Sequence, residues 1–314
     1  MKVKVFTLVP VSLLLAVSLL LAEQANATPC YVPVIPSNKL ENVISINQFA
    51  TENMLRLGLH EKLIATAYPD DEVDPSLVHL LEGIPQLSEK WPTHEQLMLL
   101  QPDLLYLGFP AGFQIGSMGS QEQWQDWGVS TLVSASYCPL KNRQLQWDDI
   151  WQDTFELARL FEVTSRAKQL KTLATAQLPS TTSTQSWRVL HFDGGGETAR
   201  VSGGFGAVDL MIRLAGAQNV ASEMQQRWGT WNWETVVYAN PEVISIAASN
   251  FSDPNKLIDY LTSHPLLKHI DAVKHQRFVV MPFSDTVASP RLINGISHLN
   301  QQLVKFSQSS NQGS

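Results

Sequence analysis

The chain has 314 residues, with 22 Lys and Arg against 29 Asp and Glu, a formal net charge of −7, and two cysteines. Apolar residues make up 44% of the chain and charged residues 16%, which excludes an intrinsically disordered protein, because disorder needs few apolar residues and much charge. The acidic balance provides no basic surface for nucleic-acid phosphates, so we expect no nucleic-acid partner. Two cysteines exclude a disulfide-dense scaffold and a four-thiolate zinc site.

The N-terminus has the pattern of an export signal. Two early lysines precede an apolar run over residues 5–22, and Ala25-Asn26-Ala27 follows as a small-x-small cleavage site. A run of this length also suits an uncleaved membrane anchor. Because Pro10 interrupts the run, we expect a cleaved signal peptide over residues 1–27 and an exported mature chain.

The two cysteines, Cys30 and Cys138, can pair in an oxidising compartment. The bond would tie the N-terminal tail to the end of the first half of the chain. It would close a loop of about a hundred residues and contribute about 4–5 kcal/mol in the chain-entropy model. Two buried free thiols are the alternative.

Strand and helix patterns alternate along the first half. Strands are predicted at 43–46, 63–65, 104–107 and 129–133, and helices at about 51–58, 95–100 and 121–127. Gly58 and Pro102 stand where helices usually stop.

The second half repeats this order. Strands are predicted at 189–192, 243–246 and 278–280, and helices at 208–214, 234–239, 254–262 and about 290–306. Glu95 and Glu234 each precede a proline (Pro102, Pro241) by seven positions, and an acid and a strand follow each proline. The shared spacing predicts two similar lobes, and the alternation predicts parallel sheets covered by helices.

Residues 148–178, between the two halves, have apolar side chains at helical spacing. Thirty helical residues measure about 45 Å at 1.5 Å per residue, enough to run along two stacked lobes. We therefore predict an α/β fold with two Rossmann-like lobes, each with a central parallel sheet, joined by a single long backbone helix. The expected units are lobe 28–147, helix 148–178 and lobe 179–314.

Several short motifs occur in the same order as in one known family. They are Pro85, Glu95–Asp103, Ser202-Gly203-Gly204, Leu214–Val220, Trp233-Glu234 to Pro241-Glu242, His264-Pro265-Leu266, Ala272-Val273-Lys274 and Ser289-Pro290-Arg291. As an ensemble this set resembles the periplasmic solute-binding proteins of ABC importers, in the class with two α/β lobes joined by one long helix. That class serves iron–siderophore complexes and vitamin B12. The first lobe departs from the family at 85–88, where Pro-x-Val-Gly is usual.

The resemblance implies a periplasmic binding protein, monomeric and not an enzyme, without a resident cofactor or metal. It implies capture of a small-molecule metal chelate of the iron(III)–siderophore type, or a corrinoid, between the lobes, and delivery to an inner-membrane permease with its ATPase. In this class one exposed glutamate at the tip of each lobe docks on permease arginines, a role that falls to Glu95 and Glu234. Alternatively both are acids at helix starts, where the dipole favours them by about 0.3–1 kcal/mol.

Ligands of doubly wound sheets bind beyond the carboxyl ends of the strands, and the loops predicted there carry aromatic residues and arginines. Aromatic rings suit stacking on a large organic ligand, and guanidinium groups pair with carboxylates. For each aromatic ring the alternative is packing beneath a loop, and for each arginine a surface position. The predicted contacts are Tyr68, Trp91, Phe109, Tyr137, Arg200, Trp228, Trp231, Phe283 and Arg291, with Phe49, Phe113 and Phe251 on the same predicted loops.

Three other functions remain open. In the first alternative, the cargo is cobalamin or another large organic molecule instead of a siderophore. A direct zinc or manganese binder needs clustered His and carboxylates, whereas the eight His are scattered and His94-Glu95 is followed by Met98 instead of a second His. A secreted hydrolase needs a Gly-x-Ser-x-Gly elbow, and Ser117 lacks that spacing.

Overall fold

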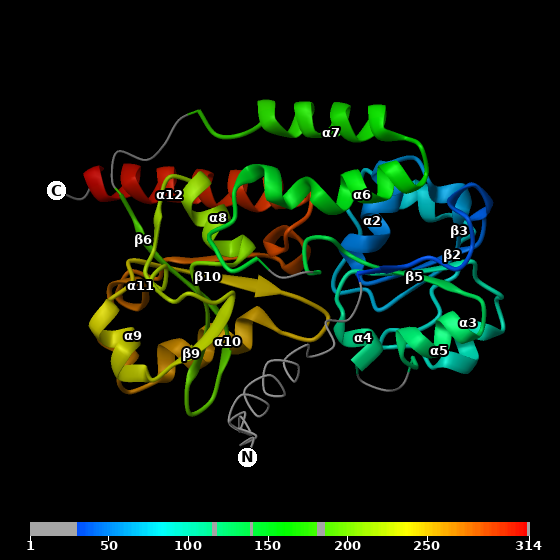
Figure 1. Ribbon diagram of the computed structural model, residues 1–314. Coiled ribbons are helices and arrows are strands. Elements are labelled where there is room, and N and C mark those ends of the chain that lie inside the picture. Colours follow the sequence, from blue (N-terminus) through cyan, green and yellow to red (C-terminus); the bar gives the residue numbers. More distant parts are fainter. Residues whose placement is uncertain (1–29, 115–117, 139–140, 181–185, 313–314) are drawn as a thin grey trace, which may run out of the picture.

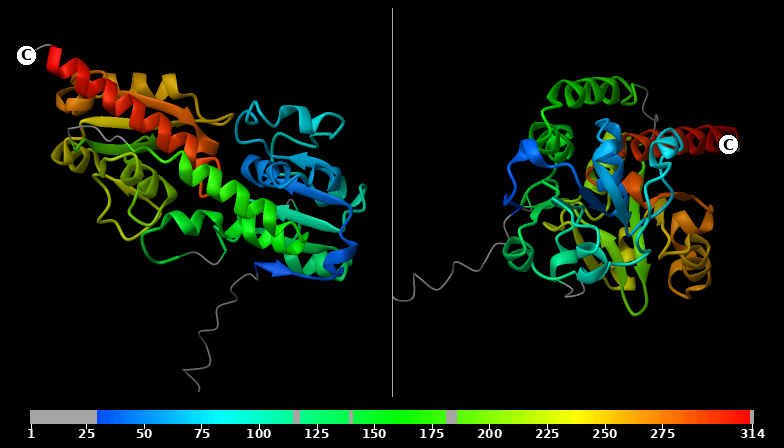
Figure 2. Two further views of the ribbon diagram at one scale, coloured as in Figure 1. Left: turned by 90° about the horizontal axis from the view of Figure 1, so that it is seen from above. Right: turned by 90° about the vertical axis from the view of Figure 1, so that its right-hand side faces the viewer.

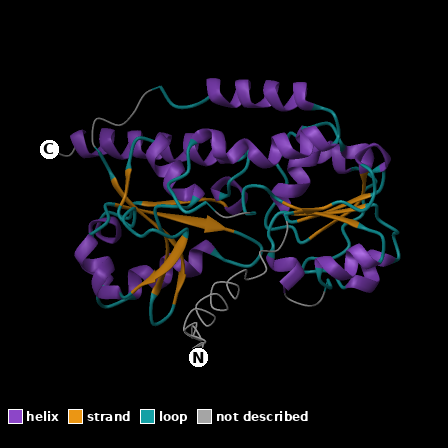
Figure 3. Cartoon of the chain, viewed as in Figure 1, coloured by secondary structure: helices purple, strands orange, loops and turns teal. Residues whose placement is uncertain are grey.

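A computed structural model describes residues 30–114, 118–138, 141–180 and 186–312, so the leader expected at 1–27 lies outside the described residues. The described chain forms two α/β lobes side by side, with helices along one common side (Figure 1). Each lobe has a sheet with helices above and below it (Figure 3). Within the described ranges, no helix combines the length and apolar character needed to cross a membrane.

The sheet of the first lobe has the strand order β1-β5-β4-β2-β3. Neighbouring strands are parallel except β1, which is antiparallel to β5. Side chains alternate between the faces, so Val43 and Ile44 enter different cores. The strands are β1 (Tyr31–Val32), β2 (Val43–Ile46), β3 (Leu63–Ala67), β4 (Leu104–Leu107) and β5 (Ser130–Val133).

The helices of the first lobe are α2 (Gln48–Arg56), α3 (His94–Met98), α4 (Ala111–Gln114) and α5 (Gln121–Asp126). Short 3₁₀ turns occur at Ser37–Lys39, His60–Lys62 and Val78–Leu81. Two of the helices begin with capping boxes, in which Thr93 accepts the N–H of Gln96 and Ser120 accepts the N–H of Gln123. These caps satisfy amides that the first helical turn leaves unpaired.

The sheet of the second lobe has the order β11-β10-β6-β7-β9, with β8 beside β6. Strands β6, β8, β10 and β11 are parallel, whereas β7 and β9 extend the sheet with antiparallel pairs that the sequence analysis did not predict. The strands are β6 (Arg188–Gly195), β7 (Ala199–Ser202), β8 (Gln218–Asn219), β9 (Trp228–Trp231), β10 (Val243–Ala248) and β11 (Phe278–Pro282). The helices are α8 (Ala207–Leu214), α9 (Trp233–Ala239), α10 (Pro254–Ser263), α11 (Asp271–Lys274) and α12 (Leu292–Gln312), with 3₁₀ turns at Leu267–His269 and Phe283–Thr286.

The repeated spacing marks one turn present in both lobes. After α3 and after α9, the residue before the proline is left-handed, with φ 49° at Gln101 and 37° at Asn240. A parallel strand, β4 or β10, follows each proline. The predicted class, two α/β lobes with mostly parallel central sheets, is thus confirmed.

The single continuous helix predicted over 148–178 is wrong. The segment is a 3₁₀ turn (Trp147–Trp151) leading into α6 (Gln152–Leu160), then a reversal, then α7 (Thr164–Ala176), which lies alongside α6 (Figures 1 and 2). At the reversal Glu162 has φ 59°, and the Val163 N–H donates to the Ala158 carbonyl at 2.8 Å. The turn packs Phe161 and Val163 against the core of the first lobe. Neither glycine nor proline signals it in the sequence.

The connection through α6 joins the two cores directly. Trp151 is buried in the core of the second lobe and Leu157 in the core of the first. Phe155, between them, packs against both. The lobes are therefore linked by packed side chains as well as by the chain.

Candidate ligand-binding site

A pocket of about 630 Å³ lies between the lobes. Its volume falls within the roughly 300–1,000 Å³ of typical small-molecule sites. Both lobes contribute aromatic rings to its lining. Both lobes also contribute cationic side chains. The aromatic lining residues are Phe109, Tyr137, Phe205, Trp228 and Phe283, and the charged ones are Lys141, Asp193, Arg200 and Arg227.

The first lobe contributes one wall of the pocket, and its aromatic rings lie just beyond the ends of two strands. Phe109 follows β4 and Tyr137 follows β5, at the carboxyl ends where ligands of parallel sheets bind. Their ring centroids are 4.7 Å apart, and Phe49 supports them from α2, 5.1 Å from Phe109. Tyr137 accepts a hydrogen bond from the Ala288 N–H of the second lobe at 3.2 Å. Burial raises the pKa of Tyr137, so its hydroxyl stays protonated at neutral pH.

The wall from the second lobe is built on the antiparallel strands β7 and β9. Trp228 pairs in register with Ser202, and both line the pocket, so this tryptophan stands on a strand and not on the loop that we predicted. Arg200 lies over the Trp228 ring at 5.4 Å, and its Nε is 3.1 Å from the carboxylate of Asp193. The strand register thus places an aromatic ring, a cation and an acid together.

Arg227, which the sequence analysis did not select, also lines the pocket. Its guanidinium lies 4.9 Å from the centroid of the Tyr137 ring, and its Nη2 donates to the Ser136 carbonyl at 2.9 Å. Both partners belong to the first lobe, so this side chain crosses between the lobes. The neighbouring Trp228 was predicted as a ligand contact because it is aromatic. No pattern in the sequence distinguishes the arginine beside it from a surface arginine.

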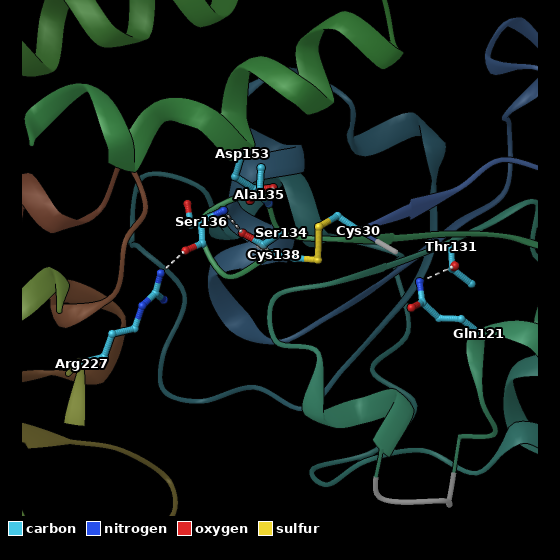
Figure 4. The surroundings of a disulfide bond; sticks show 9 residues. All are labelled: Cys30, Gln121, Thr131, Ser134, Ala135, Ser136, Cys138, Asp153 and Arg227. Atoms are coloured by element: carbon cyan, nitrogen blue, oxygen red, sulfur yellow. Dashed lines mark hydrogen bonds between the residues drawn. A yellow bond between two sulfur atoms is a disulfide. The ribbon is translucent and has the colours of Figure 1, made fainter. Parts of the chain in front are cut away.

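Cys30 and Cys138 form a disulfide, so the free-thiol alternative does not hold (Figure 4). The bond fixes the end of the loop that carries Ser136 and Tyr137, the two partners of Arg227. The Ala135 N–H of the same loop donates to Asp153 of α6 at 3.1 Å. The disulfide therefore supports one wall of the pocket.

Several predicted contacts do not line this pocket. Tyr68 packs on Trp91 at 4.4 Å and on Phe251 of the other lobe at 5.0 Å, forming a separate contact between the lobes. Trp231 packs against the core of the second lobe, and Phe113 is buried in the first. These rings pack against other side chains of the protein and do not line the pocket.

Arg291 is the clearest departure from our site prediction, because it is 6% exposed and bound by carboxylates of both lobes. It pairs with Glu52 of α2 at 2.5 Å and with Asp285 at 2.6 Å, and lies 3.8 Å from Asp71. We call these four residues the interlobe cluster. Burial alone would lower the pKa of Arg291, but the facing carboxylates raise it. This guanidinium is therefore already occupied by carboxylates and joins the two lobes instead of lining the ligand pocket.

Burial raises the pKa of Asp285 to about 6, although Arg291 acts in the opposite direction. The pKa of Asp71 is also raised by burial, against hydrogen bonds from the Ser284 N–H and hydroxyl. Two carboxyls of the interlobe cluster thus hold protons more tightly than they would in water.

A second hollow, of about 980 Å³, also borders both lobes. It has one aromatic lining residue, Phe251, and three carboxylates, Asp71, Glu72 and Glu89. A large organic ligand needs apolar and aromatic walls. The 630 Å³ pocket is therefore the candidate ligand site.

Glu95 and Glu234 occupy matching places, each exposed in the first turn of a short helix. Helices α3 and α9 lie on the same side of the molecule, opposite α6 and α7 (Figure 1). The pKa of Glu95 is lowered by its own backbone N–H and the Thr93 side chain, so it is ionised at neutral pH. Two exposed acids thus belong to helices on the same side of the molecule, one from each lobe.

The described residues contain no group of three His, Cys, Asp or Glu side chains that could hold a metal ion. The direct zinc or manganese alternative thus has no site in the part of the chain that the structure covers. His191 is buried beside Ser245, with Nδ1 2.9 Å from the hydroxyl. Ser117, weighed for the hydrolase alternative, lies outside the described residues.

Solved structures with the same fold span nearly the whole described chain. A periplasmic binding protein from Veillonella parvula has a TM-score of 0.75 at 24% identity, covering 85% of this chain and 92% of that one. An ABC-type Fe3+-hydroxamate transport system protein from Saccharomonospora viridis has 0.71 at 21%, covering 84% and 93%. The apo periplasmic heme-binding protein of Roseiflexus sp. RS-1 has 0.65 at 19%, covering 86% and 100%. At these identities the likeness establishes the fold.

No curated protein matches the chain. The family model described as "Periplasmic binding protein" matches residues 43–284, from β2 of the first lobe to the start of the 3₁₀ turn Phe283–Thr286 in the second. The match therefore includes most of both lobes, their helical connection and most of the pocket. This chain belongs to the periplasmic binding protein family.

Proposed function

We propose that this protein captures an iron(III)–siderophore-type chelate between its lobes and delivers it to the permease of an ABC importer in the inner membrane. The observation that carries the proposal is the 630 Å³ pocket, whose rings come from both lobes. Rings on opposite walls suit a bulky organic chelate, because they cover its apolar surface from two sides. The protein itself performs no reaction in this role.

Delivery rests on Glu95 and Glu234. Both are exposed, and their helices share one side of the molecule (Figure 1). A carboxylate from each lobe can pair with a permease arginine, and a bidentate pair sets orientation as well as affinity. Because each lobe supplies one contact, the permease would hold both lobes at once.

The route to the compartment is part of the same proposal. A leader over residues 1–27 would direct export and be cleaved, leaving Cys30 near the new N-terminus. An oxidising compartment then favours the Cys30–Cys138 disulfide.

Two kinds of cargo compete with a ferric siderophore. The solved structures of similar fold include a protein titled for Fe3+-hydroxamate transport and others titled heme-binding. Cobalamin is the further large organic candidate. All of them are metal chelates with extended organic surfaces, so the pocket rings alone do not select among them.

Tryptophan fluorescence of the mature protein tests the proposal. Titration with ferric siderophores, haem, cobalamin and free Zn²⁺ should give a saturable response to a chelate, since Trp228 lines the pocket. A Trp228→Phe variant should lose most of the response, whereas Trp187→Phe, in the core of the second lobe, should keep it. A tight response to free metal alone would overturn the proposed chelate cargo, and turnover of a chromogenic ester would favour the hydrolase alternative.

A further inference from the structure

The charged residues that line the pocket are unbalanced. They include three cations, Lys141, Arg200 and Arg227, against one carboxylate, Asp193. The chain as a whole is acidic, with a net charge of −7. The excess of cations at this pocket is therefore a local feature and does not follow from the overall charge of the protein.

The three cations differ in how far the protein neutralises them. Arg200 pairs with Asp193 at 3.1 Å, and Lys141 lies 3.7 Å from Asp149. Asp149 is itself held by both terminal nitrogens of Arg143, so Lys141 has only a share of that carboxylate. Arg227 has no carboxylate within ion-pair distance among the described residues.

Arg227 is also only partly satisfied as a donor. Its Nη2 donates to the Ser136 carbonyl, but its Nε is buried without a partner in the described chain. Burial without a counter-ion lowers the pKa of Arg227. A guanidinium prefers a planar anion that accepts two of its hydrogen bonds, as a carboxylate or catecholate does.

Resting on the proposed function, we infer that this pocket selects chelates with a net negative charge, and that Arg227 is the residue that recognises the anionic group. Lys141 assists from the first lobe, so the anion would be held from both sides of the cleft. Asp193 limits the attraction by occupying Arg200. The ligand class is then an anionic chelate with carboxylate or catecholate oxygens, in preference to an uncharged hydroxamate.

The test compares two ferric chelates of similar size, a trianionic tris-catecholate and an uncharged tris-hydroxamate. The wild type should bind the anionic chelate more tightly, and its affinity should fall as salt is raised, because salt screens charge attraction. Arg227→Gln should lower the ratio of anionic to neutral affinity about 30-fold, which equals about 2 kcal/mol at 1.4 kcal/mol per tenfold. Arg227→Lys should recover part of that ratio.

Asp193→Asn is expected to increase affinity for the anionic chelate, a result that misfolding of the variant could not produce. Releasing Arg200 from its acid should tighten the anionic chelate about fivefold. Arg277→Gln is the matched control, because Arg277 also stacks on a ring, 4.8 Å from the centroid of Trp187, but does not line the pocket. It should leave the ratio unchanged.

The outcomes separate this inference from the proposed function. If the wild type binds both chelates equally, or if Arg227→Gln weakens both by the same factor, charge selection is wrong and Arg227 only supports the pocket. The function as a chelate binder would then still stand. If neither chelate, haem nor cobalamin binds, the proposed function itself fails.

Discussion

Replacing Arg291 by methionine tests the physical account of the interlobe cluster. The substitution leaves Glu52, Asp71 and Asp285, each at most 9% exposed, without the cation that they face. Removing one partner of a buried ion pair costs about 3–5 kcal/mol, because the remaining charge stays buried. With an unfolding entropy of about 2.1 cal/mol/K per residue, a chain of 314 residues loses about 1.5 °C in Tm per kcal/mol, or about 5–8 °C in all.

The loss should depend on pH in a definite direction. Burial raises the pKa of Asp285 to about 6 in the folded protein, above its ordinary value, so the folded state binds more protons than the unfolded state between about pH 4 and 6. This group therefore favours folding more as pH falls through that window. Without Arg291, Asp71 and Asp285 gain protons more readily, so the defect of Arg291→Met should be larger at pH 8 than at pH 5.

Differential scanning calorimetry at the two pH values measures both effects. Arg159→Met is the control, because its pair with Glu156 on α6 is exposed and such pairs contribute about 1 kcal/mol or less. An Arg291→Met protein with the wild-type Tm at pH 8, or with a defect that is the same at both pH values, would show that the cluster does not hold the lobes as we describe.

Two further predictions concern the disulfide and the docking acids. Reduction of the Cys30–Cys138 bond should lower the free energy of unfolding by about 4–5 kcal/mol and weaken ligand binding, whereas the Cys30→Ser/Cys138→Ser protein should not respond to reductant; equal melting curves with and without reductant would contradict this. Glu95→Ala/Glu234→Ala should bind ligand normally and fail in uptake by whole cells, and normal uptake would refute the docking role.

The sequence predicted the parts of this fold that depend on local patterns. Parallel strands β2 and β10 both begin with the mostly apolar run Val-Ile-Ser-Ile, and the turn before Pro102 and Pro241 recurs at one spacing. These features need only a few neighbouring residues, so a single sequence is enough to find them. The match between the two lobes then followed from repetition.

The features that the sequence did not predict depend on distant contacts. The reversal at Glu162 has no glycine or proline, and forms because Phe161 and Val163 find a core contributed by other segments. Arg291 and Arg227 look alike in sequence, yet Arg291 faces three carboxylates, whereas Arg227 has no carboxylate partner in the part of the chain that the structure describes. Only the fold decides which arginine remains available to a ligand.

The bridge through α6 has a consequence for how the protein moves and exchanges hydrogen. Because Phe155 packs against both cores, loosening one lobe removes a contact from the other. The slowest-exchanging amide protons of the two sheets should therefore exchange with solvent in the same opening event. A ligand bound to either wall of the pocket would then slow amide exchange in both lobes. We therefore expect the two lobes, although built as repeats, to unfold as one cooperative unit.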